Sequence, residues 1–148
     1  MTAPEDINAL GKNKQKLDIN GKLKRGKNMN YYIYIDDIRN DDSWFAKTFD
    51  ATMWRPFICR TYKSAIGVLN WISGCYPEAG IVIDLDHDLG ELQEMCGEVV
   101  DERTGYDICK FIVEHKIPLV GFHIHSMNPV GAENMRQILT HYGYKEFC

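Results

Sequence analysis

Segments that favour β-strand alternate with segments that favour α-helix along this chain, and this alternation constrains the fold more than any other feature. Aromatic and β-branched residues predict strands near 31–35, 56–61, 81–83 and 118–126. After each of them, apolar residues recur at the spacing of a helix face. Strands that alternate with helices pair in parallel and carry helices on both faces of the sheet. The sequence therefore predicts a three-layer α/β/α domain with a mostly parallel sheet.

Capping residues indicate where the helices begin. The expected caps are Ser43, Thr61, Thr104 in a capping box with Asp107, and Asn128 before Pro129. Residues 90–103 are acidic and contain glycine, so we expect a loop there, over one end of the sheet.

Length and charge divide the chain into two parts. The 148 residues suit a single domain. Residues 1–30 hold seven Lys or Arg against three acids, although the whole chain has a net charge of −4. We expect 1–30 to be a basic, disordered extension and 31–148 to be the folded domain. A basic segment of this kind can also contact nucleic acid.

The sequence argues against several classes of protein. No segment approaches the roughly 20 apolar residues that a membrane helix needs, and the N-terminus resembles no secretion signal, so we expect a cytoplasmic protein. The five cysteines form no C-x-x-C pair, which argues against a zinc knuckle or a disulfide framework. Glycine-rich phosphate-binding motifs are missing too. The run from Asp84 fails as an EF-hand, because Gly90 falls at position 7 and Met95 at position 12. The oligomeric state is left open.

Polar side chains gather where three of the four predicted strands end. They are Asp36, Asp37 and Arg39 after the first strand, Asp84, Asp86, His87 and Asp88 after the third, and His123, His125, Ser126 and Asn128 at the fourth. In open parallel sheets, ligands bind at the carboxyl ends of the strands. Crowded carboxylates cost free energy unless a cation or a proton offsets them, and carboxylate oxygens suit Mg²⁺ or Mn²⁺. The sequence therefore predicts a functional site with a divalent metal.

These residues resemble the acidic pocket of receiver domains from two-component signalling. In that family a pair of aspartates like Asp36-Asp37 holds Mg²⁺, and a third aspartate, at the position of Asp84, accepts a phosphoryl group. The resemblance implies a receiver-like, flavodoxin-like fold. The chain departs from it because only Tyr144–Phe147 remain for a fifth strand and its lysine, so that strand is expected to be short or missing.

Four motifs narrow the resemblance to a divergent branch. They are Asp36-Asp37-x-Arg39, Asp86-His87-Asp88-Leu89, Thr104-Gly105-Tyr106-Asp107 and the stretch from His125-Ser126 to Asn134-Met135. Together they are similar to the cyclic-phosphate-processing receiver-like family, which occurs in phage and bacterial genomes. The resemblance implies activity on cyclic phosphates, such as the 2′,3′-cyclic ends of RNA or cyclic nucleotides.

The leading hypothesis is thus a metal-assisted phosphoesterase. Its metal ligands would be Asp36, Asp37 and Asp84. Its catalytic residues would be His125, His87, Asp84 and Asp86, and its substrate-binding residues Arg39, Ser126, Asn128 and His123. The alternative is a pseudo-receiver that binds a nucleotide or a protein partner without catalysis.

Overall fold

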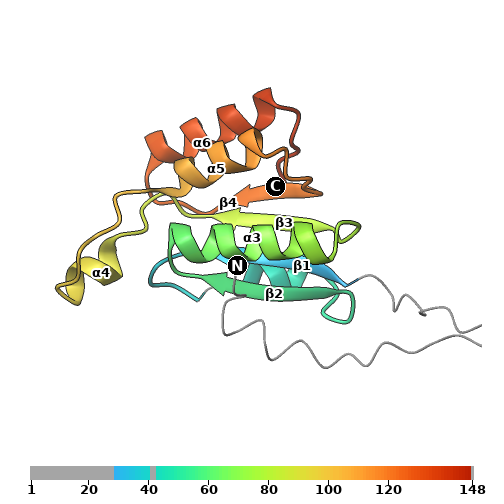
Figure 1. The fold of residues 1–148 in the computed structure, drawn as a ribbon, viewed down its shortest axis with the longest axis horizontal. Helices are drawn as coiled ribbons and strands as arrows, with labels where there is room; N and C mark the ends of the chain where they lie inside the picture. Colours follow the sequence, from blue (N-terminus) through green and yellow to red (C-terminus); the bar gives the residue numbers. More distant parts are fainter. Residues whose placement is uncertain (1–28, 41–42, 148) are drawn as a thin grey trace, which may run out of the picture.

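The computed structural model describes residues 29–40 and 43–147, which form a four-stranded parallel sheet with helices on both faces (Figure 1). The strands are β1 (Asn30–Ile35), β2 (Trp54–Cys59), β3 (Ile81–Leu85) and β4 (Gly121–Ile124). The helices are α2 (Ser43–Thr48), α3 (Tyr62–Cys75), α4 (Glu91–Met95), α5 (Gly105–Glu114) and α6 (Pro129–His141). The basic extension expected at 1–30 lies outside the described residues up to residue 28 and stays a prediction.

The strand order is β2-β1-β3-β4, and every neighbouring pair is parallel. This is the start of the receiver-like order 2-1-3-4-5, so the predicted fold class is confirmed. A remnant of the fifth strand follows α6: Glu146 forms an isolated parallel bridge with Phe122. The fifth strand is therefore reduced to one bridge, as expected for so short a C-terminal segment.

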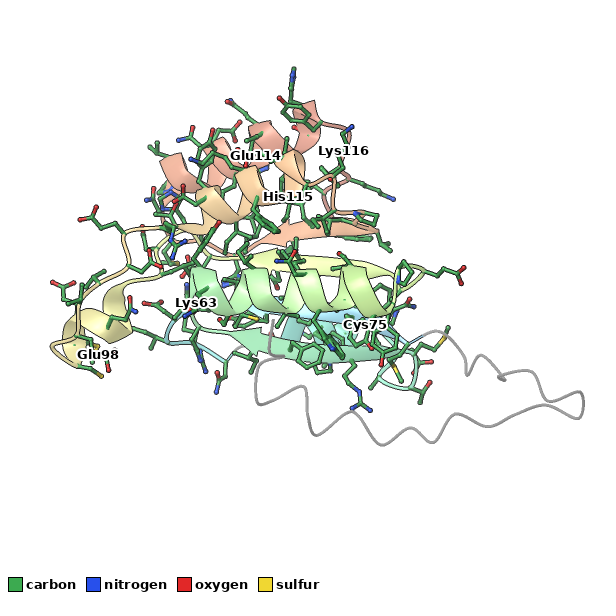
Figure 2. All side chains as sticks on the ribbon, in the orientation of Figure 1. Lys63, Cys75, Glu98, Glu114, His115 and Lys116 are labelled. Atoms are coloured by element: carbon green, nitrogen blue, oxygen red, sulfur yellow. The ribbon has the colours of Figure 1, made fainter. Side chains whose placement is uncertain are left out.

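One face of the sheet carries the main apolar core. Ile33, Ile83 and Phe122 point to this face from three neighbouring strands and are fully buried. Helices α3, α5 and α6 cover them with residues such as Leu69 and Met135. Figure 2 shows His115 and Lys116 at the end of α5 that is remote from the carboxyl ends of the strands, which places His115 away from the polar cluster.

The opposite face is covered by the short helix α2. Tyr32, Tyr34 and Val82 pack there with Phe45 in a small aromatic cluster, and Phe147 joins it from the C-terminal segment. Because strand residues alternate between faces, Asp84 and His123 point to this same side as Tyr34. The polar residues of the predicted site therefore lie partly on this face and partly beyond the ends of the strands.

Three of the four expected caps are found, whereas Ser43, the fourth, is the first residue of α2 itself. Thr61 accepts a hydrogen bond from the Ser64 amide, Thr104 and Asp107 form a capping box, and Asn128 caps α6. Gly105 opens α5 where no side chain fits, since a Cβ there would lie 2.0 Å from the Asp86 carbonyl oxygen. Its amide donates to the carbonyl of His87 at 2.8 Å, which ties the start of α5 to the end of β3.

Two expectations need correction. Residues 90–103 are not wholly loop, because Glu91–Met95 form α4; these five residues are good helix formers, and the Glu94 amide donates to the Gly90 carbonyl. The fourth strand is Gly121–Ile124 rather than 118–126, since Asn128 and its neighbours turn the chain into α6. The segment with α4 extends outward from the carboxyl edge of the sheet (Figure 1).

Candidate active site at the carboxyl edge of the sheet

The register of the strands arranges the polar residues in two levels. At the first level, Tyr34 of β1 pairs with Asp84 of β3, which pairs with His123 of β4. Two residues further along each strand, on the same face, come Asp36, Asp86 and His125. The sheet thus brings together residues that lie about fifty and forty positions apart in sequence.

The second level has the composition of a metal site. Asp36, Asp86 and His125 each offer a ligand atom, and these atoms lie within 4.8 Å of one another. Both carboxylates are buried. Two carboxylate oxygens and one imidazole nitrogen suit Mn²⁺ or another divalent ion that accepts mixed oxygen and nitrogen ligands. The donor set therefore fits the divalent metal expected from the sequence.

Asp36 is held by the turn that follows β1. Its Oδ1 accepts the amides of Ile38 and Arg39 at 3.0 and 2.7 Å, and its Oδ2 accepts Nε of Arg39 at 2.8 Å. Burial alone would raise the pKa of Asp36, but these hydrogen bonds and the Arg39 charge outweigh it and lower the pKa. Asp36 is therefore an ionised carboxylate with a fixed orientation.

The pKa of Asp86 is shifted in the opposite direction to that of Asp36. Burial and the nearby charge of Asp36 raise its pKa. Nη2 of Arg39 lies 3.4 Å from its Oδ2, so one guanidinium contacts both carboxylates of the candidate metal-ligating group, which is Asp36, Asp86 and His125. The Arg39 side chain remains 43% exposed and can reach a ligand from solvent.

Asp84 is buried inside β3 and accepts three hydrogen bonds. Tyr32 donates its hydroxyl to Oδ2, while Nδ1 of His123 and Nδ1 of His125 lie 2.9 and 2.6 Å from Oδ1. Burial raises the pKa of Asp84, but the two histidines and Tyr32 outweigh it, so its pKa is lowered. His123 and His125 therefore both face the carboxylate cluster.

Each of these histidines stacks on an aromatic ring. His125 lies on Tyr34, with ring centroids 4.6 Å apart and planes 7° from parallel, and Nε2 of His125 is 3.1 Å from Oδ2 of Asp36. Burial lowers the pKa of His125, but the carboxylates around it, Asp84 first, outweigh burial and raise it. His123 stacks on Trp44, with ring centroids 4.1 Å apart and planes 8° from parallel.

Three further predicted residues lie at the start of α6. The His87 ring packs against Gly131, where a Cβ would meet it at 2.4 Å, and Nδ1 of His87 contacts Asp88 at 2.9 Å. Oγ of Ser126 accepts the Asn128 amide, and Asn128 accepts the Gly131 amide. These side chains shape the loop that enters α6.

The candidate metal-ligating group differs from the ligand set expected from the sequence. Asp36 belongs to both, whereas Asp37 and Asp84 lie outside the group that Asp86 and His125 complete. Asp37 is buried beside Asp36. No observation on a bound ion tests either set, so both stay predictions.

Sequence reasoning missed four residues that build the site. Tyr32 and Tyr34 share the face of Asp36 by the alternation of β1, so the period of two could have identified them. Arg60 directly follows β2 and donates to the carbonyls of Asp36 and Arg39, so the strand-end rule also applies to it. Trp44 reaches His123 from α2, and no sequence pattern signals that contact.

Comparison with known proteins agrees with this geometry. The family model described as the cyclic-phosphate processing receiver domain matches residues 31–141, well over half of the chain. The searches of curated proteins and of solved structures found no match. None of the helices in the described part of the chain has the length and apolar character needed to cross a bilayer.

Proposed function

Because this chain belongs to the cyclic-phosphate processing receiver family, we propose that it is a metal-assisted phosphoesterase that opens cyclic phosphates. Its substrates would be cyclic nucleotides or the 2′,3′-cyclic ends of RNA. The observation that carries the proposal is the imidazole of His125 set against Asp36 and Asp86 in a receiver-type acidic pocket.

In this proposal Asp36, Asp86 and His125 hold a divalent ion, Mn²⁺ or Mg²⁺. Once bound, such an ion supplies positive charge for the phosphoryl oxygens and makes water more acidic. The two buried carboxylates and the 15% exposed His125 side chain leave little room for competing solvent. In this proposal the role of these three residues is therefore to bind the ion and fix its position.

The substrate phosphate would lie between Arg39 and the start of α6. Arg39 offers a partly exposed guanidinium, which suits a phosphate better than a point charge does. The first turn of α6 adds a helix N-terminus, which favours anions. Ser126 and Asn128 fix the loop on that side.

Opening a cyclic phosphate also requires a proton for the departing oxygen. His87 directly follows Asp86 and lies beside the first turn of α6, so it is our candidate for this proton transfer. The contact of its Nδ1 with Asp88 would orient the ring and leave Nε2 for the substrate.

The alternative is a non-catalytic pseudo-receiver that binds or signals to a nucleotide or protein partner, and a signalling form phosphorylated on Asp84 is less well supported than the phosphoesterase. Both oxygens of Asp84 already accept hydrogen bonds from buried or half-buried partners. Receivers carry a lysine on the fifth strand, and Lys145 is the lysine in the corresponding segment of this chain. It lies beside the start of β4, whereas the acidic residues lie past the other end of that strand. A stable acyl phosphate on Asp84 after incubation with a small phosphodonor, detected by mass, would favour the alternative.

The proposal is tested by turnover of 2′,3′-cyclic nucleotides and of an RNA oligonucleotide with a 2′,3′-cyclic end. Chromatography of the quenched reaction follows the conversion of cyclic phosphate into a monoester, with Mn²⁺, with Mg²⁺ and with excess chelator. We expect monoester only when a metal is present. Intact cyclic phosphate in every sample, with metal binding verified by calorimetry, would refute the proposal.

A further inference from the structure

Asp84 is a buried carboxylate whose hydrogen-bond partners in the described part of the chain are all side chains, and it is not part of the candidate metal-ligating group of Asp36, Asp86 and His125. It lies within β3, one level below Asp36 and Asp86, and is 1% exposed. Its partners come from two other strands: Tyr32 from β1, and His123 and His125 at β4 and its end. Every partner is a group that can donate a hydrogen bond.

This arrangement fixes which nitrogen of each imidazole faces Asp84. Oδ1 of Asp84 lies 2.9 Å from Nδ1 of His123 and 2.6 Å from Nδ1 of His125, so Nδ1 is the ring nitrogen that each histidine places to donate to this carboxylate. The remaining nitrogen of His125, Nε2, is the one that faces Asp36 at 3.1 Å. Nε2 is therefore the nitrogen that His125 offers to the group with Asp36 and Asp86.

Packing restricts the same rings. Tyr34 stacks on His125 with nearly parallel planes, and Trp44 stacks on His123 in the same way. A flip of the His125 ring would turn its Nδ1 away from Asp84 and lose the 2.6 Å contact. The carboxylate and the aromatic rings together leave one orientation in which all these contacts are made.

We infer that Asp84 is a positioning residue, which holds Nδ1–H of His125 so that Nε2 is directed to the metal site, and that it neither ligates the metal nor accepts a phosphoryl group. Metal-binding histidines commonly donate their second nitrogen to a carboxylate in this way, and loss of that carboxylate weakens metal binding about 10- to 100-fold. The inference rests on the proposed metal site. It assigns to Asp84 a role other than the metal ligand or nucleophile expected from the sequence.

The first test compares the unmodified chain with Asp84→Asn, which keeps the shape of the side chain and removes its charge. Mn²⁺ affinity is measured by calorimetry, and we expect about a 10- to 100-fold weaker Kd for the variant. Glu133→Gln removes one carboxylate from the exposed side of α6 and serves as the matched control. It should bind Mn²⁺ as the unmodified chain does.

A second measurement needs no variant and so does not depend on whether Asp84→Asn folds. Nitrogen-15 NMR of the unmodified chain loaded with diamagnetic Zn²⁺ identifies which imidazole nitrogen of His125 carries hydrogen. We expect hydrogen on Nδ1 and the metal on Nε2. Hydrogen on Nε2, or a folded Asp84→Asn protein with unchanged Mn²⁺ affinity, would overturn the inference while leaving the metal site intact. Failure of the unmodified chain to bind any metal would refute the proposed function itself.

Discussion

Asp84 and Asp86 show how position decides the chemistry of two identical side chains. They lie two residues apart, Asp84 within β3 and Asp86 directly after it, yet hydrogen bonds lower the pKa of Asp84 while burial and Asp36 raise the pKa of Asp86. Asp84 accepts hydrogen bonds from Tyr32, His123 and His125. Asp86 instead lies close to the negative charge of Asp36. Asp86 therefore gains more from a bound cation than Asp84 does.

His125 contacts Asp84 through Nδ1 and belongs to the group with Asp36 and Asp86. We predict that His125→Ala lowers the rate of cyclic-phosphate hydrolysis by about a hundredfold or more, because loss of a proposed metal ligand should cost at least as much as the roughly 10- to 100-fold loss for a residue that only supports a ligand. The fold should persist, because His123 and Tyr32 still donate to Asp84. His141→Ala, in the exposed last turn of α6, is the control and should be close to neutral. A folded and fully active His125→Ala enzyme would remove this residue from the mechanism.

At the residue scale, the sequence predicted which polar side chains lie together, but not which of them would ligate a metal and which would orient a ligand. The strand-end rule was sufficient for Asp36, Asp86 and His125, because parallel strands carry such groups to one edge. Whether Asp84 belongs to the metal-ligating group or supports it depends on strand register and on ring orientation. Both are set by long-range packing, including the contact of Trp44 with His123, which a single sequence does not encode locally.

At the scale of elements, helix α5 is docked on the end of β3 by a glycine. The start of α5 approaches β3 so closely that its Gly105 amide bonds to the His87 carbonyl, while the Asp86 carbonyl occupies the space of a side chain. The position of the helix thus constrains the backbone that carries Asp86 and His87. This coupling of α5 to the site is local, and it depends on the missing side chain of Gly105 together with its backbone hydrogen bond.

We predict that Gly105→Ala destabilises the protein by about 1–3 kcal/mol, because the added carbon must displace backbone. Mn²⁺ affinity should fall as well, since Asp86 moves with that backbone. Gly74→Ala is the matched control: a Cβ there meets nothing within 4 Å, and alanine favours a helix over glycine. It should stabilise α3 by roughly 0.5–1 kcal/mol. Urea unfolding measures both, and equal stabilities for the two variants would contradict the docking argument.

The elements themselves were largely predictable, and the misses have local causes. Caps at Thr61, Thr104 and Asn128 were found because short-range hydrogen bonds determine them. Helix α4 was missed because an acidic segment with glycine on both sides resembles a loop. The extent of β4 was overestimated, since its apolar residues continue past the point where the sheet can pair them.

For the whole molecule, the unequal covering of the sheet explains where the polar network lies. Three helices close one face over an apolar core, while α2 and an aromatic cluster cover the other. On that second face, Asp84 and His123 take the place that apolar residues occupy on the first, and Tyr32 and Trp44 enclose them. The fold of a receiver is thereby combined with a buried carboxylate–histidine network that leads to the edge of the sheet.

The most direct test of this account is the anomalous scattering of Mn²⁺ in crystals of the protein grown with the metal. We predict one strong peak bounded by the carboxylates of Asp36 and Asp86 and by Nε2 of His125, with Asp84 in contact with His125 and not with the metal. A peak coordinated by Asp36, Asp37 and Asp84 instead, or metal bound only at other places on the surface, would contradict it.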